Sequence, residues 1–409
     1  MKILYYPQIS SVANGKAVLN TEATFNIMLT FIKCINEMHN TFEWVFLIPS
    51  KSEFNKEMPS NVTMIPIDMY LDSKIGRYDF NAQKVEAIIK EHKPDIIINN
   101  NPTLTRNIRI LAPNTPIIQK NDFQGHGLPE NINYRIRQVD GVISSDVAFE
   151  ITQANKDLFI RYAANEFNSK IINILKKKIR VIKQGAYAKE INEWKKRFTV
   201  ERFNVPWKIV FPGRIGTTNY NHWHDMLGAI TTGQFDTREF QFIFTNPTKE
   251  KGKQILIERL QKQNISIIKE NDHTDFTELV LEHGQSIYLF KYPDVREKYI
   301  ELLCTSNVGV QLFDKNEEPH GGIACREMAW CNLKLILSDT FRVNGFVKKN
   351  YKYIVNMSSY TNTVKDLIKK IKAIVKEDGS LVYNVETMEE GAKILNDTIM
   401  ELLNVKKTN

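Results

Sequence analysis

Residues 81–99 read NAQKVEAIIKEHKPDIIIN, and this stretch decides the fold. Apolar residues recur at helical spacing over Asn81–His92, and Lys93-Pro94 marks the expected end of that helix, because the residue before a proline avoids helical backbone. The next run, Asp95–Asn99, has no polar alternation, which is typical of a strand buried on both faces of a parallel sheet. A helix followed by such a strand predicts a layered α/β domain.

The same alternation of strand and helix extends through the first half of the chain. Alternating units of this kind predict a doubly wound parallel sheet with helices on both faces. A helix is expected over Thr21–Met38. The other expected strands of this half are Lys2–Tyr6, Glu43–Ile48, Val62–Ile67, Pro116–Gln119 and Gly141–Ser144.

A second sheet is expected in the other half. The chain has 409 residues, more than one hydrophobic core usually organises. We expect two Rossmann-like doubly wound domains facing a cleft, formed by residues 1–190 and residues 191–385. A C-terminal helix within 386–409 is expected to cross back to the first domain. The expected strands of the second sheet are Trp207–Pro212, Phe240–Thr245, Ile265–Ile268, Ser286–Phe290, Val308–Leu312 and Leu333–Leu337.

The charge of the chain is moderately positive. Lysine and arginine number 55 against 47 acids, so the formal net charge is +8. Most of the excess lies in residues 170–197, where the only acids are Glu190 and Glu193. This stretch is either an exposed helix and linker, or a surface for a polyanion such as double-stranded DNA or an anionic membrane. The candidate contacts are Lys176, Lys177, Lys178, Arg180 and Lys183.

Cysteine usage and hydropathy indicate a cytoplasmic protein. None of the four cysteines forms a C-x-x-C pair, so neither a disulfide framework nor a zinc site is expected. No apolar run approaches the ~18 residues of a membrane-spanning helix. The N-terminus enters a short strand and not a signal-peptide core. If the protein is viral, this compartment is the host cytoplasm.

Several common active-site motifs are missing from the sequence. It contains neither G-x-G-x-x-G nor a P-loop, which argues against dehydrogenases and P-loop enzymes. It also lacks H-E-x-x-H and G-x-S-x-G, which argues against zinc proteases and α/β-hydrolases. No metal site is expected.

The first candidate ligand loop follows the first expected strand of the second domain. Residues 211–218 read FPGRIGTT, and the absence of a side chain at Gly213 lets the backbone approach a ligand closely. Arg214 can offer a planar, permanently charged fork to phosphate oxygens, and Thr217 adds a hydroxyl. The loop therefore predicts a diphosphate site, with a tight turn and a surface arginine as the alternative.

The second candidate loop reads EEPHGGIACREMA, residues 317–329, and enters a helix near Gly322. Backbone N–H groups at such a helix start, next to Gly321 and Gly322, suit an anion or sugar hydroxyls. Glu327 lies on the expected helix, where its carboxylate can accept hydrogen bonds from a ribose diol. The alternative is an ordinary surface acid on a helix.

Together, these two loops resemble the C-terminal domain of retaining GT-B glycosyltransferases. In that family, a glycine–arginine loop binds the diphosphate, and a helix carries a pair of glutamates. Glu327 matches the second glutamate, which implies a contact with the nucleotide ribose. The first glutamate should fall at Pro319. Glu318 or Glu317, one or two positions earlier, is therefore the candidate for the donor sugar, with His320 beside the proline.

The chain departs from this family after the arginine loop. A lysine usually follows there, whereas this chain has NYNHWH at residues 219–224. One interpretation is that His222 or His224 substitutes for the lysine. The other is that either histidine caps the next helix.

The N-terminal half carries the same resemblance. Gly15 lies where the family's glycine-rich loop approaches the donor phosphate, and Gln119–Asp122 resembles its strand-Q-H-D signature with Asn121 in place of histidine. Within the family, the pattern is most similar to that of phage DNA α-glucosyltransferases. The resemblance implies acceptor positioning or proton handling by Asp122 and His126. Glu22, at the start of the first helix, is a further catalytic candidate or simply a helix-start acid.

The resemblance also implies a reaction. We expect sugar transfer from a nucleotide-diphosphate donor, UDP-sugar favoured, to an acceptor hydroxyl with retention and without an obligatory metal or other cofactor. Residues 191–385 would be the nucleotide-sugar-binding domain, and residues 1–190 would lie on the acceptor side. The acceptor expected from the subfamily is a hydroxymethylated base in phage DNA. Two alternatives remain open. One is a glycan or lipid-linked acceptor at the cytoplasmic membrane face, and the other is a non-catalytic binding protein for sugar nucleotide or nucleic acid on the same scaffold.

Overall fold

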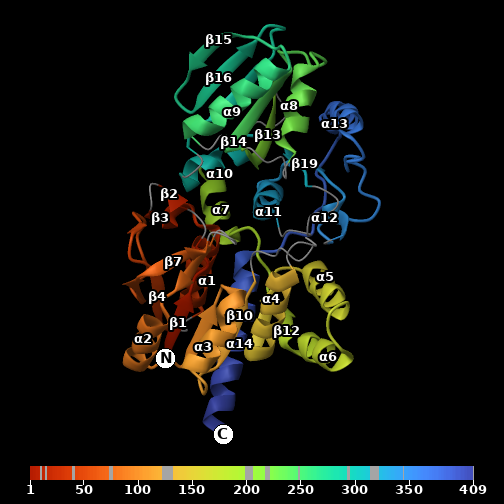
Figure 1. Cartoon of the computed structure of the whole chain (residues 1–409). Helices are drawn as coiled ribbons and strands as arrows, with labels where there is room; N and C mark the ends of the chain where they lie inside the picture. Colours follow the sequence, from red (N-terminus) through yellow and green to blue (C-terminus); the bar gives the residue numbers. More distant parts are fainter. Residues whose placement is uncertain are drawn as a thin grey trace. The chain divides into compact units, whose positions relative to one another are not determined.

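The protein divides into two compact units. Unit 1 comprises Met1–Gln184 and Thr387–Asn409, and unit 2 comprises Gly185–Glu386. The boundaries expected from the sequence lie after residues 190 and 385, close to the two points where the chain passes between the units. The computed structural model, drawn in Figure 1, describes residues 1–9, 12–13, 16–38, 42–72, 77–121, 132–198, 206–216, 222–246, 249–292, 295–313, 322–343 and 345–408.

Unit 1 is built on a parallel sheet. Its seven described strands follow the order β12-β11-β10-β9-β1-β4-β6, and every neighbouring pair is parallel. The central strands are buried on both faces, as their unbroken apolar runs predict. The strands are β1 (Lys2–Tyr6), β4 (Glu43–Pro49), β6 (Val62–Ile67), β9 (Ile96–Asn99), β10 (Ile117–Lys120), β11 (Val147–Glu150) and β12 (Ile179–Val181).

Helices cover both faces of this sheet. Alternate residues of a strand point to opposite faces, so Leu4 of β1 packs in the cluster that includes Ile88 and Ile108, whereas the Tyr5 ring contacts Phe46 at 4.6 Å on the other side. The helices of unit 1 are α1 (Ala23–Glu37), α2 (Ala82–His92), α3 (Thr105–Leu111), α4 (Ile132–Ser144), α5 (Gln153–Ala164), α6 (Ser169–Lys178) and α14 (Met388–Thr408).

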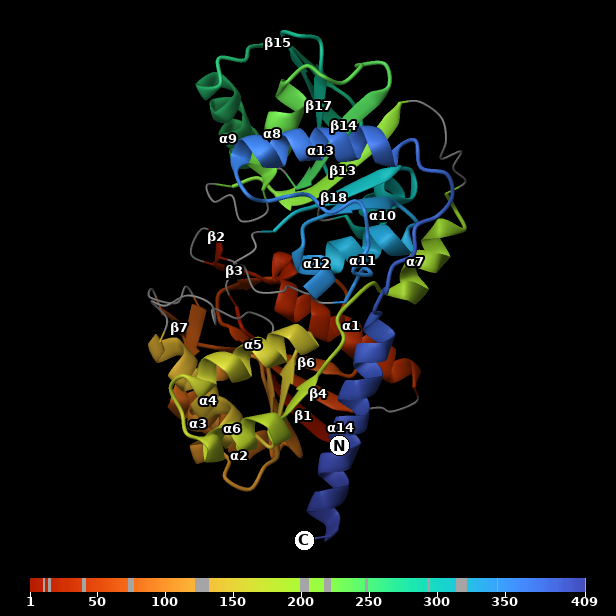
Figure 2. The same ribbon diagram turned by 90° about the vertical axis from the view of Figure 1, so that its right-hand side faces the viewer.

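The C-terminal helix α14 belongs to unit 1. It packs against α1, and both are labelled in Figure 2. Gly391 allows a very close approach, because a Cβ there would lie 1.9 Å from the carbonyl oxygen of Lys183. The small remaining strands of unit 1 are β2 (Val12–Ala13), β3 (Lys16–Val18) and β5 (Ser52–Glu53) in one sheet and β7 (Met69–Asp72) with β8 (Arg77–Phe80) in another; the short 3-10 turns are η1 (Leu19–Thr21) and η2 (Pro102–Leu104).

One expected strand of this half is wrong. Residues Gly141–Ser144 form the last turn of helix α4, and the strand β11 begins only at Val147. A short apolar run does not distinguish a strand from a buried helix segment. Gly141 permits close packing of this helix, because a Cβ there would come within 2.3 Å of the Pro102 carbonyl oxygen.

Unit 2 contains the second sheet. Its strand order is β15-β16-β17-β14-β13-β18-β19; the five strands from β17 to β19 run parallel, and β15 and β16 add an antiparallel edge. The strand expected at Ile265–Ile268 begins later, as β15, and β16 was not expected because these edge residues are partly exposed and mixed in polarity. The strands are β13 (Trp207–Arg214), β14 (Phe240–Asn246), β15 (Ile267–Asp272), β16 (Phe276–Leu281), β17 (Ser286–Phe290), β18 (Val308–Gln311) and β19 (Lys334–Leu337).

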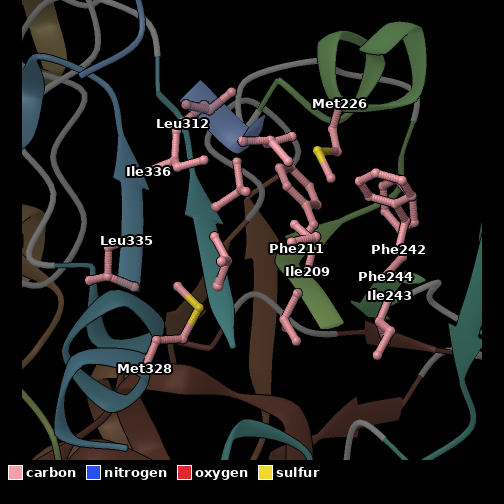
Figure 3. Packing of buried hydrophobic residues seen from close by; sticks show 14 of the residues in the cluster. Ile209, Phe211, Met226, Phe242, Ile243, Phe244, Leu312, Met328, Leu335 and Ile336 are labelled. Atoms are coloured by element: carbon pink, nitrogen blue, oxygen red, sulfur yellow. The ribbon is translucent and has the colours of Figure 1, made fainter. Parts of the chain in front are cut away.

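The core of unit 2 joins this sheet to its helices. Figure 3 shows Phe211 and Phe244 from adjacent strands, with Met328 reaching in from α11. The two phenylalanine rings lie 5.4 Å apart. Helix α13 packs beside α8 and β19. The helices of unit 2 are α7 (Ala188–Lys195), α8 (Trp223–Thr231), α9 (Lys249–Lys262), α10 (Arg296–Cys304), α11 (Ile323–Trp330), α12 (Thr340–Val343) and α13 (Tyr360–Ile374).

Candidate functional site

The two candidate ligand loops of unit 2 leave neighbouring strands. The first loop follows β13 and the second follows β18, and these strands are paired in parallel, with Ile209 opposite Val308. The carboxyl ends of both strands therefore meet at one edge of the sheet, which is where open parallel sheets bind their ligands. The topology brings together two motifs that are far apart in the sequence.

The glycine–arginine loop begins inside strand β13. Gly213 is buried within the strand, and the pairing with β14 changes register between Phe211 and Arg214. Such an irregularity bends a strand and redirects its last residues. The Arg214 side chain and Thr217 lie outside the described part of the chain, so their predicted contacts with a diphosphate stay predictions.

The loop then connects to helix α8 through buried contacts. The indole of Trp223 is fully buried, and its Nε1 donates to the Gly216 carbonyl oxygen at 3.2 Å. His222 precedes the helix with a left-handed φ of 56°, a conformation that is uncommon for residues other than glycine. Its Nδ1 lies 2.6 Å from Oδ2 of Asp225, a buried carboxylate.

His224, on the first turn of α8, has a strongly lowered pKa. Burial, reinforced by the Arg259 cation, lowers the pKa of His224 to about 4. His224 is therefore neutral near pH 7 and is a poor substitute for a lysine at a phosphate. His222 occupies the helix-cap position, as one alternative predicted, but its side chain makes no capping hydrogen bond with the helix backbone.

The second loop enters helix α11 at Gly322, as expected. This residue has a φ of 54°, and a Cβ there would lie 2.9 Å from the Phe341 ring, so both backbone and space require glycine. The N–H groups of the first turn of α11 have no partner within the helix. Three predicted donor contacts, Glu318, His320 and Gly321, lie outside the described residues.

Glu327 is a buried residue and not a surface acid. It is 5% exposed, and its Oε1 lies 2.6 Å from Nη1 of Arg296, the first residue of α10. Arg296 also donates from Nε to Oε1 of Glu190 on α7 at 2.8 Å. Burial alone would lower the pKa of Arg296, but the two carboxylates outweigh it and raise the pKa above its ordinary value. Sequence reasoning missed Arg296 and did not assign Glu190 to the site.

The neighbouring residue Arg326 is also ion-paired. Its side chain is 2% exposed and contacts the Glu386 carboxylate, at the end of unit 2. Its guanidinium lies 5.6 Å from the centroid of the Phe346 ring. Helix α11 is therefore held by charged contacts at two successive positions.

In unit 1, a buried chain of polar side chains lies at the carboxyl ends of three strands. Thr105 Oγ1 donates to Gln119 Oε1 at 2.7 Å, Gln119 Nε2 donates to Asn121 Oδ1 at 3.0 Å, and Asn121 Nδ2 donates to Glu150 Oε1 at 2.7 Å. All four residues are fully buried. Asn121, which replaces the histidine of the resembled signature, is thus joined to the carboxylate at the end of β11.

The predicted catalytic residues of unit 1 are only partly placed. Glu22 is 2% exposed and occupies the position that precedes α1, where Thr24 Oγ1 lies 3.4 Å from its Oε1. Gly15, Asp122 and His126 lie outside the described residues, and their roles stay predictions.

The basic stretch makes contacts within unit 1. Arg180 forms a double hydrogen bond with Glu401 at 2.6 and 2.8 Å, and Lys183 lies 3.3 Å from Glu390, so both contact α14. Lys178 Nζ donates to the Ile143 carbonyl oxygen at the end of α4. Three of the five predicted polyanion contacts therefore have structural partners. Lys176 and Lys177 are exposed.

Thiols, metal ligands and membrane segments add no further site. All four cysteines are buried and reduced; Cys304 Sγ and Cys331 Sγ are 3.6 Å apart. Among the described residues, no group of three or more His, Cys, Asp or Glu side chains could hold a metal ion. Within the same ranges, none of the helices has the length and apolar character needed to cross a membrane.

Comparisons with known proteins identify the fold. No protein-family model and no curated protein sequence matches the chain, but many solved structures do. They include sucrose-phosphate synthase from Thermosynechococcus elongatus (9% identity, TM-score 0.62, covering 99% of both chains). They also include the UDP-forming trehalose-phosphate synthase of Burkholderia xenovorans with glucose-6-phosphate (12% identity, TM-score 0.59, covering 100% of this chain and 98% of that one). Anabaena HepE with UDP and glucose matches at 11% identity and a TM-score of 0.55, covering 100% of this chain and 99% of HepE.

These similar structures are GT-B glycosyltransferases. The expected fold class, α/β with two Rossmann-like domains of the GT-B type, is thereby confirmed. At these identities the likeness establishes the fold, and the activity has to be argued from the site.

Proposed function

We propose that the protein is a retaining glycosyltransferase that transfers a hexose from a UDP-sugar to an acceptor hydroxyl. The observation that carries this proposal is the pairing of β13 with β18, which joins the glycine–arginine loop and the helix of Glu327 at one sheet edge. A diphosphate needs cations and backbone N–H groups, and a ribose needs a carboxylate acceptor. We expect Arg214, the N–H groups at the start of α11 and Glu327 to supply these three types of group. The similar structures that hold UDP make it the favoured nucleotide.

The proposed chemistry depends on the leaving group. When the bond to the sugar breaks, negative charge develops on the diphosphate, and the Arg214 guanidinium with the N–H groups at the start of α11 would stabilise it. A retaining transfer on the same face of the sugar needs no enzymic nucleophile, so none is assigned. Asp122 and His126 are proposed to orient the acceptor hydroxyl and to handle its proton.

Release of UDP tests this proposal. Wild-type protein with UDP-glucose, UDP-galactose and UDP-N-acetylglucosamine is expected to release UDP in at least one case. Arg214→Ala is expected to lower this rate about a hundredfold or more, as removal of a group that stabilises transition-state charge does. Glu327→Ala is expected to weaken donor binding and raise KM, because the ribose loses its carboxylate acceptor. Arg238→Ala and Glu258→Gln, at exposed positions of the same unit, are the matched controls. No release from any UDP-sugar would reject the enzyme and leave a binding protein.

For the acceptor, we propose a hydroxymethylated base in phage DNA, in a cytoplasmic reaction. The loop resemblance supports this choice, and exposed Lys176 and Lys177 offer cations for a phosphate backbone. Mass spectrometry of hydroxymethylated duplex DNA should detect an added hexose that unmodified duplex lacks. Salt-resistant binding to anionic liposomes, with no hexose on DNA, would favour the lipid-linked acceptor instead.

A further inference from the structure

Three helices of unit 2 contribute to one charged triad. Glu190 lies on α7, Arg296 begins α10, and Glu327 lies on α11. The guanidinium uses Nε for Glu190 and Nη1 for Glu327, at 2.8 and 2.6 Å. The side chain of Glu327 is 7% exposed, against 37% for Arg296 and 24% for Glu190. The least accessible member is thus the carboxylate that the proposed function assigns to the donor.

The triad holds more negative than positive charge. Two carboxylates share one guanidinium, so the formal charge of the group is −1. A carboxylate removed from water is costly unless its oxygens accept hydrogen bonds. The Oε1 atom of Glu327 accepts from Arg296, but the structure gives Oε2 no hydrogen-bond partner among the described residues. A ligand that donates hydrogen bonds would supply the missing partner, whereas an anion would be repelled.

Helix α10 adds a second group beside this carboxylate. Burial raises the pKa of Tyr299, and the negative charge of Glu327 raises it further, so the phenol stays protonated. The carboxylate therefore has one cationic partner, Arg296, and the charge of Glu327 acts on a phenol that stays neutral. Its rotation is restricted by Arg296, because moving Oε1 would break the pair.

We infer that Arg296 is a positioning residue for the donor: it fixes Oε1 of Glu327 so that Oε2 accepts a hydroxyl of a vicinal diol, the ribose of the nucleotide. This inference rests on the proposed function. Glu190 balances Arg296 from the other side and keeps the guanidinium from turning away. The ligand class is a neutral diol and not a phosphate, because the triad carries surplus negative charge.

Calorimetry with two nucleotides tests this role. Wild-type protein is expected to bind UDP about tenfold or more tightly than 2′,3′-dideoxyuridine diphosphate, since a charge-assisted hydrogen bond supplies a factor of this size. Arg296→Met should lose most of this preference and retain its affinity for the dideoxy compound. Glu327→Gln should behave similarly. Lys298→Met, on the same helix and paired only with exposed or half-buried acids, should retain the full preference.

The outcomes separate the inference from the proposed function. A purely structural role for Arg296 would weaken both nucleotides equally, and that result would overturn the inference. Should Arg296→Met fail to fold by circular dichroism, Arg296→Lys serves, because lysine keeps the charge but not the fork geometry and should lower the preference partially. An unchanged preference in Arg296→Lys would also overturn the inference. If the wild-type protein binds neither nucleotide, the proposed function fails as well.

Discussion

At the scale of single residues, Trp223 separates two histidines that the sequence leaves equivalent. His222, before Trp223, contacts the buried carboxylate of Asp225. His224, after Trp223, has a pKa of about 4. Partial burial is the first cause of that low pKa, followed by Arg259. The sequence alone does not reveal these different environments.

The low pKa of His224 predicts a pH dependence of stability. An unfolded histidine titrates near 6.5, so between this value and about 4 the unfolded chain binds the extra proton and the native state does not. The free energy of unfolding should therefore fall as the pH drops through this window. In urea unfolding at pH 7 and pH 4.5, His224→Asn should lose less stability than wild type. His283→Asn, at an exposed position, should behave like wild type; equal acid sensitivity in both variants would contradict the assignment.

Spacing in the sequence could predict some site residues but not others. The glycines at 213 and 322 and the helix position of Glu327 follow from local patterns, because each depends on its own strand or helix. Arg296 could not be predicted, since its partners Glu190 and Glu327 come from distant segments and meet it only through packing of three helices. No local signal distinguishes such an arginine from an exposed one.

At the scale of elements, contact between β18 and α11 positions the helix that carries Glu327. A Cβ at Gly309 would lie 2.4 Å from Sδ of Met328 and 2.8 Å from a methyl group of Leu335. Because Gly309 has no side chain, Met328 of α11 can pack directly against the sheet; Figure 3 labels Met328 in this core. Glu327 precedes Met328 on α11, so the packing of Met328 also helps to position the Glu327 carboxylate.

Gly309→Ala should therefore disturb both stability and donor binding. Overpacking of this type costs about 1–3 kcal/mol, and the shift of α11 should raise KM for the donor more than it lowers kcat. Met328→Ala opens space, so Gly309→Ala/Met328→Ala should be more stable than the sum of the two single changes allows. Additive losses in thermal unfolding would show that the two residues do not share this contact.

Strands with a clear pattern of apolar residues were predictable from the sequence, and strands of mixed polarity were not. Strands β1, β6 and β17 have the expected bounds because their apolar runs are unbroken or end at clear turn signals. The run Gly141–Ser144 is part of helix α4, and its glycine allows this helix to pack closely against Pro102. A short apolar run in the sequence does not reveal such packing. The edge strands β15 and β16 alternate with charged residues and depend on pairing with β17.

At the scale of the whole molecule, the buried thiols report on each unit separately. Cys34 lies in unit 1, and Cys304, Cys325 and Cys331 lie in unit 2. Burial raises the pKa of the Cys325 thiol, and a hydrogen bond from Cys304 together with burial raises that of Cys331. Thiolate is the reactive form, so all four groups should be inert in the native protein.

Labelling with DTNB in increasing urea tests this prediction. Native protein should show almost no colour, and Cys34→Ser should remove only the signal that accompanies the unfolding of unit 1. Far-UV circular dichroism of the same samples gives the unfolding curve for comparison. Rapid labelling of native protein at Cys304 or Cys331 would contradict the burial of this pair.

The chain enters unit 2 after Gln184 and leaves it after Glu386, so this unit is encoded by one continuous stretch of the gene. Ala186 N donates to the Glu386 carbonyl oxygen at 3.1 Å, so the second and the last residues of this unit are hydrogen-bonded neighbours. A segment whose ends meet can be excised or exchanged as one continuous coding cassette. Residues 185–386 could thus be replaced by the corresponding region of another protein of this fold. Under the proposed function, this exchange would change the sugar donor and leave the acceptor half of the gene intact.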